Sequence, residues 1–95
     1  MGSAYFKVTS FGVTAEEAFT EAVSEARYQH GNGGYTGTIA EKHAFKVVVP
    51  REGETPQECV SRRTKAGIFS DDKWGPAGCV KVGEDQWCFF GWASS

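Results

Sequence analysis

The chain has no marked excess of charge of either sign, because ten Lys and Arg residues stand against twelve Asp and Glu residues. A net charge of −2 gives the molecule as a whole no electrostatic reason to bind DNA, RNA or an anionic membrane. Its longest apolar runs fall far short of the roughly 20 residues that a membrane-spanning helix needs. The first residues also lack a basic-then-apolar leader. We therefore expect a cytoplasmic protein with neither a membrane nor a nucleic-acid polymer as partner.

Cysteine is scarce and follows no recognisable pattern. The three residues, Cys59, Cys79 and Cys88, are odd in number and have no C-x-x-C spacing. A disulfide framework usually shows an even count, and a structural zinc site shows paired ligands. Cys79 and Cys88 could face each other across a hairpin, but the pattern favours three reduced, half-buried thiols. The H-E-x-x-H and G-x-S-x-G motifs are absent too, so the sequence predicts neither a metal nor another cofactor.

Two segments carry the signature of a helix start. Residues 14–17, TAEE, form a capping box in which the Thr14 hydroxyl accepts from the Glu17 amide and the Glu17 carboxylate reaches back. An uninterrupted helical stripe of apolar residues follows, namely Ala15, Ala18, Phe19, Ala22, Val23 and Ala26. Residues 55–58, TPQE, form a second capping box with proline at the first helical position. They predict a shorter helix over residues 56–66.

Extended segments surround these helices. Residues 4–11 predict a first strand. Residues 35–49 predict either one long strand or two strands with a bend near residues 41–44. Residues 79–82 and 86–92 flank the loop 83–85 and predict a terminal hairpin. The chain should therefore form one domain over residues 1–95. The expected fold is α+β, a two-layer sandwich whose four- to five-stranded, mostly antiparallel sheet carries both helices on one face.

In such a sandwich the second face of the sheet is uncovered. The last predicted strand places aromatic side chains on both of its faces, namely Trp87, Phe89, Phe90 and Trp92. Large apolar patches rarely stay exposed on monomers, so the sequence predicts a homo-oligomer.

The segment 30–39, HGNGGYTGTI, is the candidate functional site. Four glycines can turn several amide groups toward one point and form an anion-binding nest. The segment leaves a helix C-terminus, whereas the common phosphate loops enter a helix N-terminus, so it is neither a P-loop nor a dinucleotide fingerprint. It is either a flexible connector or a ligand loop. The candidate ligand-binding residues here are Gly33, Gly34, Thr36 and Thr38.

Several side chains have both a structural and a chemical interpretation. His30 is either a hydrogen-bonded residue at the helix end or a general acid or base, and His43 lies either in an exposed turn or beside a phosphate. Arg62 is either a solvated charge matched to the helix dipole or a phosphate contact. Trp74 either anchors a loop or stacks on a base.

The pattern of His30-Gly31 and then Tyr35-x-Gly37-Thr38-Ile39, behind a short amphipathic helix, resembles a family of small phage-encoded proteins with a helix followed by a YxGTI core. The resemblance covers roughly residues 14–42. Small phage proteins of this size include several that counter bacterial immunity by binding or cleaving nucleotide second messengers. The resemblance therefore implies a counter-defence role in the cytoplasm of an infected bacterial host.

These observations lead to three hypotheses. In the first, the protein is a metal-independent phosphodiesterase that cleaves a cyclic (di)nucleotide. His30 or Tyr35 would assist proton transfer, and Lys42 would stabilise the developing charge. Thr36 and Thr38 would then hold the phosphate. In the second, the protein is a non-catalytic sponge that sequesters a nucleotide-derived immune signal. In the third, it inhibits a host enzyme through its aromatic C-terminal face.

Overall fold

The computed structural model describes residues 3–30, 38–65 and 76–94. Within these ranges the chain forms β1 (Ser3–Phe11), α1 (Ala15–His30), the short 3-10 helix η1 (Ile39–Glu41), β2 (Phe45–Val47), α2 (Pro56–Lys65), β3 (Ala77–Gly83) and β4 (Gln86–Ser94). None of the helices in the described part is long and apolar enough to span a membrane.

The four strands form one sheet in the order β1-β4-β3-β2. β4 pairs antiparallel with both β1 and β3, and β2 pairs parallel with β3. A parallel pair needs a crossover connection, and α2 provides it between β2 and β3. The predicted α+β class and the four-stranded, mostly antiparallel sheet are confirmed.

Both predicted capping boxes are present. The Glu17 amide donates to the Thr14 hydroxyl at 3.2 Å and the Thr14 amide donates to the Glu17 carboxylate at 3.3 Å. Thr55 and Glu58 make the same reciprocal pair at 2.9 and 3.1 Å. These local bonds satisfy amides that a helix N-terminus would otherwise leave without partners.

The prediction of one long strand over residues 35–49 is wrong for its described part. Thr38 caps η1 by accepting a hydrogen bond from the Ala40 amide at 3.2 Å, and Lys42 closes the turn by donating its amide to the Ile39 carbonyl at 2.9 Å. Extended pairing resumes only at β2, which is three residues long. The alternative with a bend is closer to the structure. The terminal hairpin is present, with a loop of two residues instead of three.

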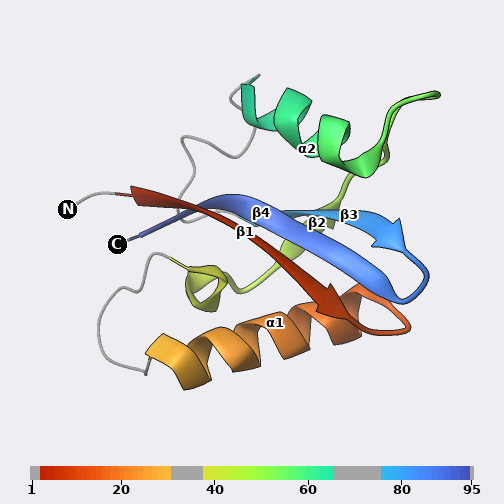
Figure 1. The fold of residues 1–95 in the computed structure, drawn as a ribbon. Coiled ribbons are helices and arrows are strands. Elements are labelled where there is room, and N and C mark those ends of the chain that lie inside the picture. Colours follow the sequence, from red (N-terminus) through yellow and green to blue (C-terminus); the bar gives the residue numbers. More distant parts are fainter. Residues whose placement is uncertain (1–2, 31–37, 66–75, 95) are drawn as a thin grey trace.

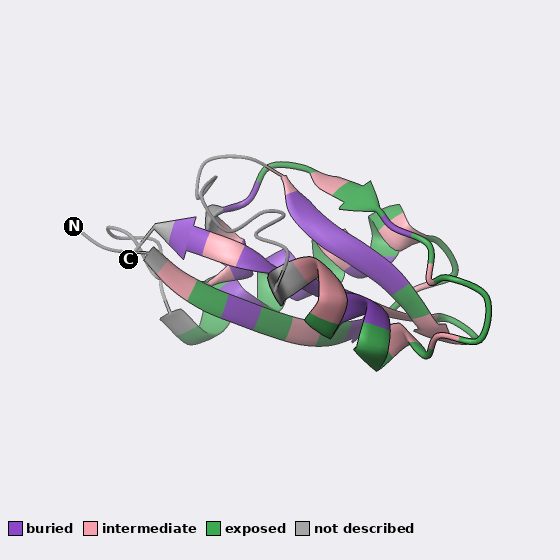
Figure 2. Ribbon diagram, turned by 90° about the horizontal axis from the view of Figure 1, so that it is seen from above, coloured by how far each residue is buried: buried purple, intermediate pink, exposed green. Residues whose placement is uncertain are grey.

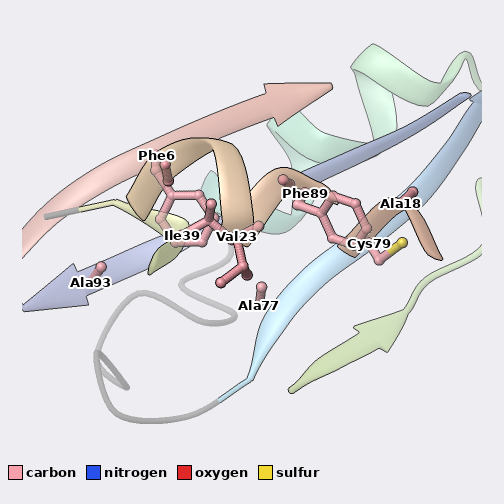
Figure 3. Close-up of a cluster of buried hydrophobic side chains, with 10 residues drawn as sticks. Phe6, Ala18, Val23, Ile39, Ala77, Cys79, Phe89 and Ala93 are labelled. Atoms are coloured by element: carbon pink, nitrogen blue, oxygen red, sulfur yellow. The ribbon is translucent and has the colours of Figure 1, made fainter. Parts of the chain in front are cut away.

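The two helices lie on opposite faces of the sheet, so the prediction that they share one face is wrong (Figure 1). The side chains that pack with α1 form the α1 cluster, which consists of Phe6, Ala18, Ala22, Val23, Ala26, Ile39, Ala77, Cys79, Phe89 and Ala93 (Figure 3). Those that pack with α2 form the α2 cluster, which consists of Val48, Cys59, Val60, Val80, Cys88 and Phe90. Successive side chains of a strand point to opposite faces. Cys79 and Val80 therefore enter different clusters, as do Phe89 and Phe90.

Covering both faces changes the exposure of the aromatic residues in β4. Figure 2 shows that the first part of β3 is uniformly buried, whereas β1 alternates between buried and exposed residues. Phe89 and Phe90 are fully buried, while Trp87 and Trp92 are half-buried. The open aromatic face from which the homo-oligomer was predicted is thus largely covered. The homo-oligomer stays a prediction without this support.

Candidate functional site

A basic hollow of about 470 Å³ lies between α1 and the chain that follows η1. Its lining includes three basic side chains, namely His43, Lys42 and Arg27. Thr20 and Ser24 line the hollow as well, and Phe19 and Val23 are its apolar lining residues. We call this site the basic hollow.

Local structure explains how these residues come together. Thr20, Ser24 and Arg27 follow one another at helical spacing and form a polar stripe on α1, beside the apolar stripe that enters the α1 cluster. Lys42 is the C-cap residue of η1 and has extended backbone angles, so the chain turns away from the 3-10 helix there. The Thr38 cap therefore acts indirectly on the basic hollow, because it fixes the turn that places Lys42.

Lys42 is the least usual residue of the basic hollow, because only 2% of its surface is exposed. Lysine is almost never fully buried unless it is paired, since removing an ammonium group from water costs several kcal/mol. Lys42 does take part in a further noncovalent interaction within the protein. His43 and Arg27, in contrast, are exposed. Two accessible basic side chains beside a buried lysine suit the recognition of an anion.

The structure places only some of the predicted site residues. Lys42 lines the basic hollow, and Thr38 serves as the cap of η1. His30 is the last residue of α1, but its side chain lies outside the described residues. Several further predicted residues lie wholly outside them, namely Gly33, Gly34, Tyr35, Thr36 and Trp74. Their predicted roles stay predictions.

Arg62 lies on α2, across the sheet from the basic hollow, so the structure does not bring it to Lys42 (Figure 1). Its guanidinium group binds Glu54 with two bonds, from Nε to Oε2 at 2.8 Å and from Nη2 to Oε1 at 3.0 Å. Such a bidentate pair fixes both side chains. It ties the second half of α2 to the loop that precedes the helix, which is a structural role.

This pair should make stability depend on pH in the acid range. The hydrogen bond from the Arg62 guanidinium, which is the largest cause, and the one from the Arg51 amide together lower the pKa of Glu54 from 4.5 to about 2. Because the pKa is lower in the folded state, the contribution is complete above pH 4.5 and disappears as the pH falls toward 2. We expect Glu54→Gln to be less stable than the wild type in urea unfolding at pH 6, with the difference vanishing near pH 2. A difference that does not depend on pH would contradict this assignment.

The sequence alone does not predict the three polar residues that α1 contributes to the basic hollow, namely Thr20, Ser24 and Arg27. Their helical spacing was visible, but an exposed polar stripe is the ordinary outer face of an amphipathic helix. Only the position of Lys42 across from it distinguishes this stripe. The sequence allows His43 either in an exposed turn or beside a phosphate, and its exposed position next to Lys42 is compatible with both interpretations.

The three cysteines are buried and reduced, as predicted, although more deeply than expected. Cys79 and Cys88 cannot form the cross-hairpin pair because they point to opposite faces of the sheet, and their partners in the register are Phe89 and Val80. Burial raises the pKa of Cys79 to about 12 and also raises that of Cys88. At neutral pH these thiols are protonated and poorly nucleophilic.

The structure is that of a small, layered α+β protein with a basic hollow on its surface. This description classifies the protein by its fold, and a fold alone does not imply an activity. Among the residues that the structure describes, no three His, Cys, Asp or Glu side chains are grouped as metal ligands. No protein-family model matches the chain, and the searches of curated proteins and of solved structures gave no significant match.

Proposed function

We propose that this protein binds a small phosphorylated ligand in the basic hollow and that the ligand is a nucleotide second messenger. The observation that carries the proposal is the buried Lys42 in one hollow with Arg27 and His43. A volume of about 470 Å³ falls within the range of about 300–1,000 Å³ that is usual for small-molecule sites. Arginine recognises phosphate oxygens with two parallel bonds, and lysine contributes a compact charge.

The apolar and hydroxyl-bearing wall of the hollow supports a nucleotide over inorganic phosphate. Phe19 and Val23 offer surface for a base or a sugar, while Thr20 and Ser24 offer donors and acceptors. The resemblance of residues 14–42 to small phage proteins favours a role in sequestering an immune signal. Sequestration needs affinity alone, which this set of groups supplies.

Cleavage of the ligand is the second candidate, and the accessible imidazole of His43 beside Lys42 is the observation that favours it. In a hydrolysis, water would attack phosphorus while His43 accepts its proton. The P–O ester bond would break, and the leaving alkoxide would take a proton from solvent. Lys42 and Arg27 would stabilise the negative charge that grows on the phosphoryl oxygens.

The test is calorimetric titration with a panel of cyclic dinucleotides and cyclic ADP-ribose isomers, followed by recovery of the ligand by heat. We expect Arg27→Gln to weaken binding of the cognate ligand about tenfold or more, because a hydrogen bond to a charged group is lost. Lys46→Gln removes the same charge from the exposed surface of β2, outside the hollow, and should leave affinity unchanged. Equal effects of both variants, or no binding by any compound, would refute the proposal.

Recovery of the ligand separates the two candidates. Intact ligand after heating indicates sequestration, and altered ligand indicates cleavage. If cleavage occurs, His43→Ala should abolish turnover while binding persists. Turnover that survives this change would exclude His43 as the proton acceptor.

A further inference from the structure

A second surface feature lies between α1 and the outer edge of β1. β1 is an edge strand: it pairs with β4 over all nine of its residues, and no other described strand pairs with it. An edge strand presents a row of backbone amide and carbonyl groups that can pair with another chain. Such a strand of nine residues offers a long template.

A hollow of about 370 Å³ follows this edge. Six consecutive residues of β1, 5–10, line it, together with Ala22 and Ala26 of α1 and with Ile39. Alternate residues of a strand point to opposite faces, so a hollow over one face would be lined by every second residue. Because consecutive residues of β1 line this hollow, we infer that it runs along the outer backbone edge of the strand. One bank is therefore the edge of β1 and the other bank is α1.

The hollow continues into a second, wider one of about 830 Å³, and the two share Thr9, Ser10 and Glu25. The bank that α1 contributes to the combined groove is acidic, with Glu16, Glu17, Glu21 and Glu25. Among the described residues that line the groove, Lys7 is the only cation. We call the two hollows together the edge groove.

We propose that the edge groove binds an extended, lysine- or arginine-rich segment of a partner protein, which adds to the sheet as a strand beside β1. Strand addition is a recurring mode of peptide recognition, in which backbone hydrogen bonds supply affinity and neighbouring side chains supply specificity. Here the edge of β1 offers the backbone groups, and the glutamates of α1 select a positively charged segment.

Charge also argues against a second copy of this chain in the groove. A twofold pairing of β1 with its own copy would place both α1 helices on the same face of the joined sheet. The acidic banks would then meet, and like charges in contact are unfavourable. β1 itself brings one lysine, Lys7, to four glutamates. The inference is independent of the proposed phosphorylated ligand, because the basic residues Arg27, Lys42 and His43 do not line the edge groove. Thr20 lines both sites.

The test uses a fluorescent ten-residue peptide in which lysine alternates with valine or threonine, at low ionic strength. We expect the peptide to bind and an otherwise identical glutamate peptide not to bind. Successive amides of a strand point to opposite edges, so two N-methylated forms are compared, each blocking one alternate set. One form should lose binding and the other should keep it. Equal affinity of the two forms, or no binding by the lysine peptide, would overturn the proposal.

Variants locate the binding surface. Glu21→Gln with Glu25→Gln should weaken binding roughly 2- to 30-fold, as expected for two exposed charge pairs, and high salt should reduce the difference. The control, Glu52→Gln with Glu84→Gln, removes two exposed charges outside the groove and should have no effect. Equal weakening by both double variants would overturn the proposal. So would a dimer, detected by sedimentation, that excludes the peptide.

Discussion

Replacing Phe89 with alanine is expected to lower the free energy of unfolding by about 3–5 kcal/mol, a large share of the 5–15 kcal/mol typical of a whole domain. Phe89 is completely buried in the α1 cluster. Its ring lies 5.5 Å from that of Phe19 and 5.7 Å from that of Phe45, and the latter two are 5.0 Å apart. The three rings join β4, α1 and β2. Urea unfolding followed by circular dichroism measures the loss.

Phe11 provides the matched control for this prediction. It is also a phenylalanine in a strand, but 65% of its surface is exposed. Phe11→Ala removes the same atoms without leaving a buried cavity, so it should cost far less than Phe89→Ala. A similar loss in the two variants would show that the α1 cluster is not the main source of stability.

The features that the sequence predicts best are the helix N-termini, because each depends on hydrogen bonds between residues that are three positions apart. The bonds between Thr14 and Glu17, and between Thr55 and Glu58, form wherever a helix starts at those positions. The start of α1 and that of α2 could therefore be placed at the correct residue. The 3-10 turn at Thr38 is local as well, but its residues also fit a strand pattern of alternating threonines. Here the periodicity was misleading.

The position of α2 depends on packing between distant segments and could not be derived in this way. A strand that is buried on both faces shows a continuous apolar run, and Cys88, Phe89 and Phe90 form such a run. The same run also fits a strand with one open aromatic face, and the sequence pattern alone predicts that arrangement. What distinguishes the two is that Cys59 and Val60 of α2 pack against Val80 and Phe90.

In the candidate site, too, local features could be predicted from the sequence, whereas contacts between distant segments could not. Lys42 was identified from its sequence neighbours, but its burial and its closeness to Arg27 arise only when η1 packs beside α1. Most of the glycine-rich segment from which the site was predicted lies outside the described residues. The acidic bank of the edge groove, in turn, is a set of glutamates that reads as an ordinary solvated helix face. What gives these charges a function to test is their position beside β1, a strand with only one neighbour, β4, among the described strands.

Gly78→Ala should be the second most damaging change, with an expected loss of about 1–3 kcal/mol in the free energy of unfolding. Gly78 is paired with Phe90 across β3 and β4, and the Phe90 ring lies directly over it. A Cβ atom at Gly78 would lie 2.5 Å from Cζ of Phe90 and 2.8 Å from both Cε atoms. The ring cannot move aside, because only 1% of it is exposed and the α2 cluster surrounds it.

A double-mutant cycle distinguishes this clash from a general effect of alanine in a strand. Phe90→Leu shortens the side chain over Gly78, so Gly78→Ala should cost less in that background than in the wild type. Gly83→Ala is the control, since its new Cβ would meet only the flexible side chain of Gln86, at 3.0 Å or more. If the two costs of Gly78→Ala are equal, the clash is not the cause. If Gly78→Ala costs less in the Phe90→Leu background, the Phe90 ring is what requires glycine at position 78. The packing of this ring in the α2 cluster then contributes to the stability of the core.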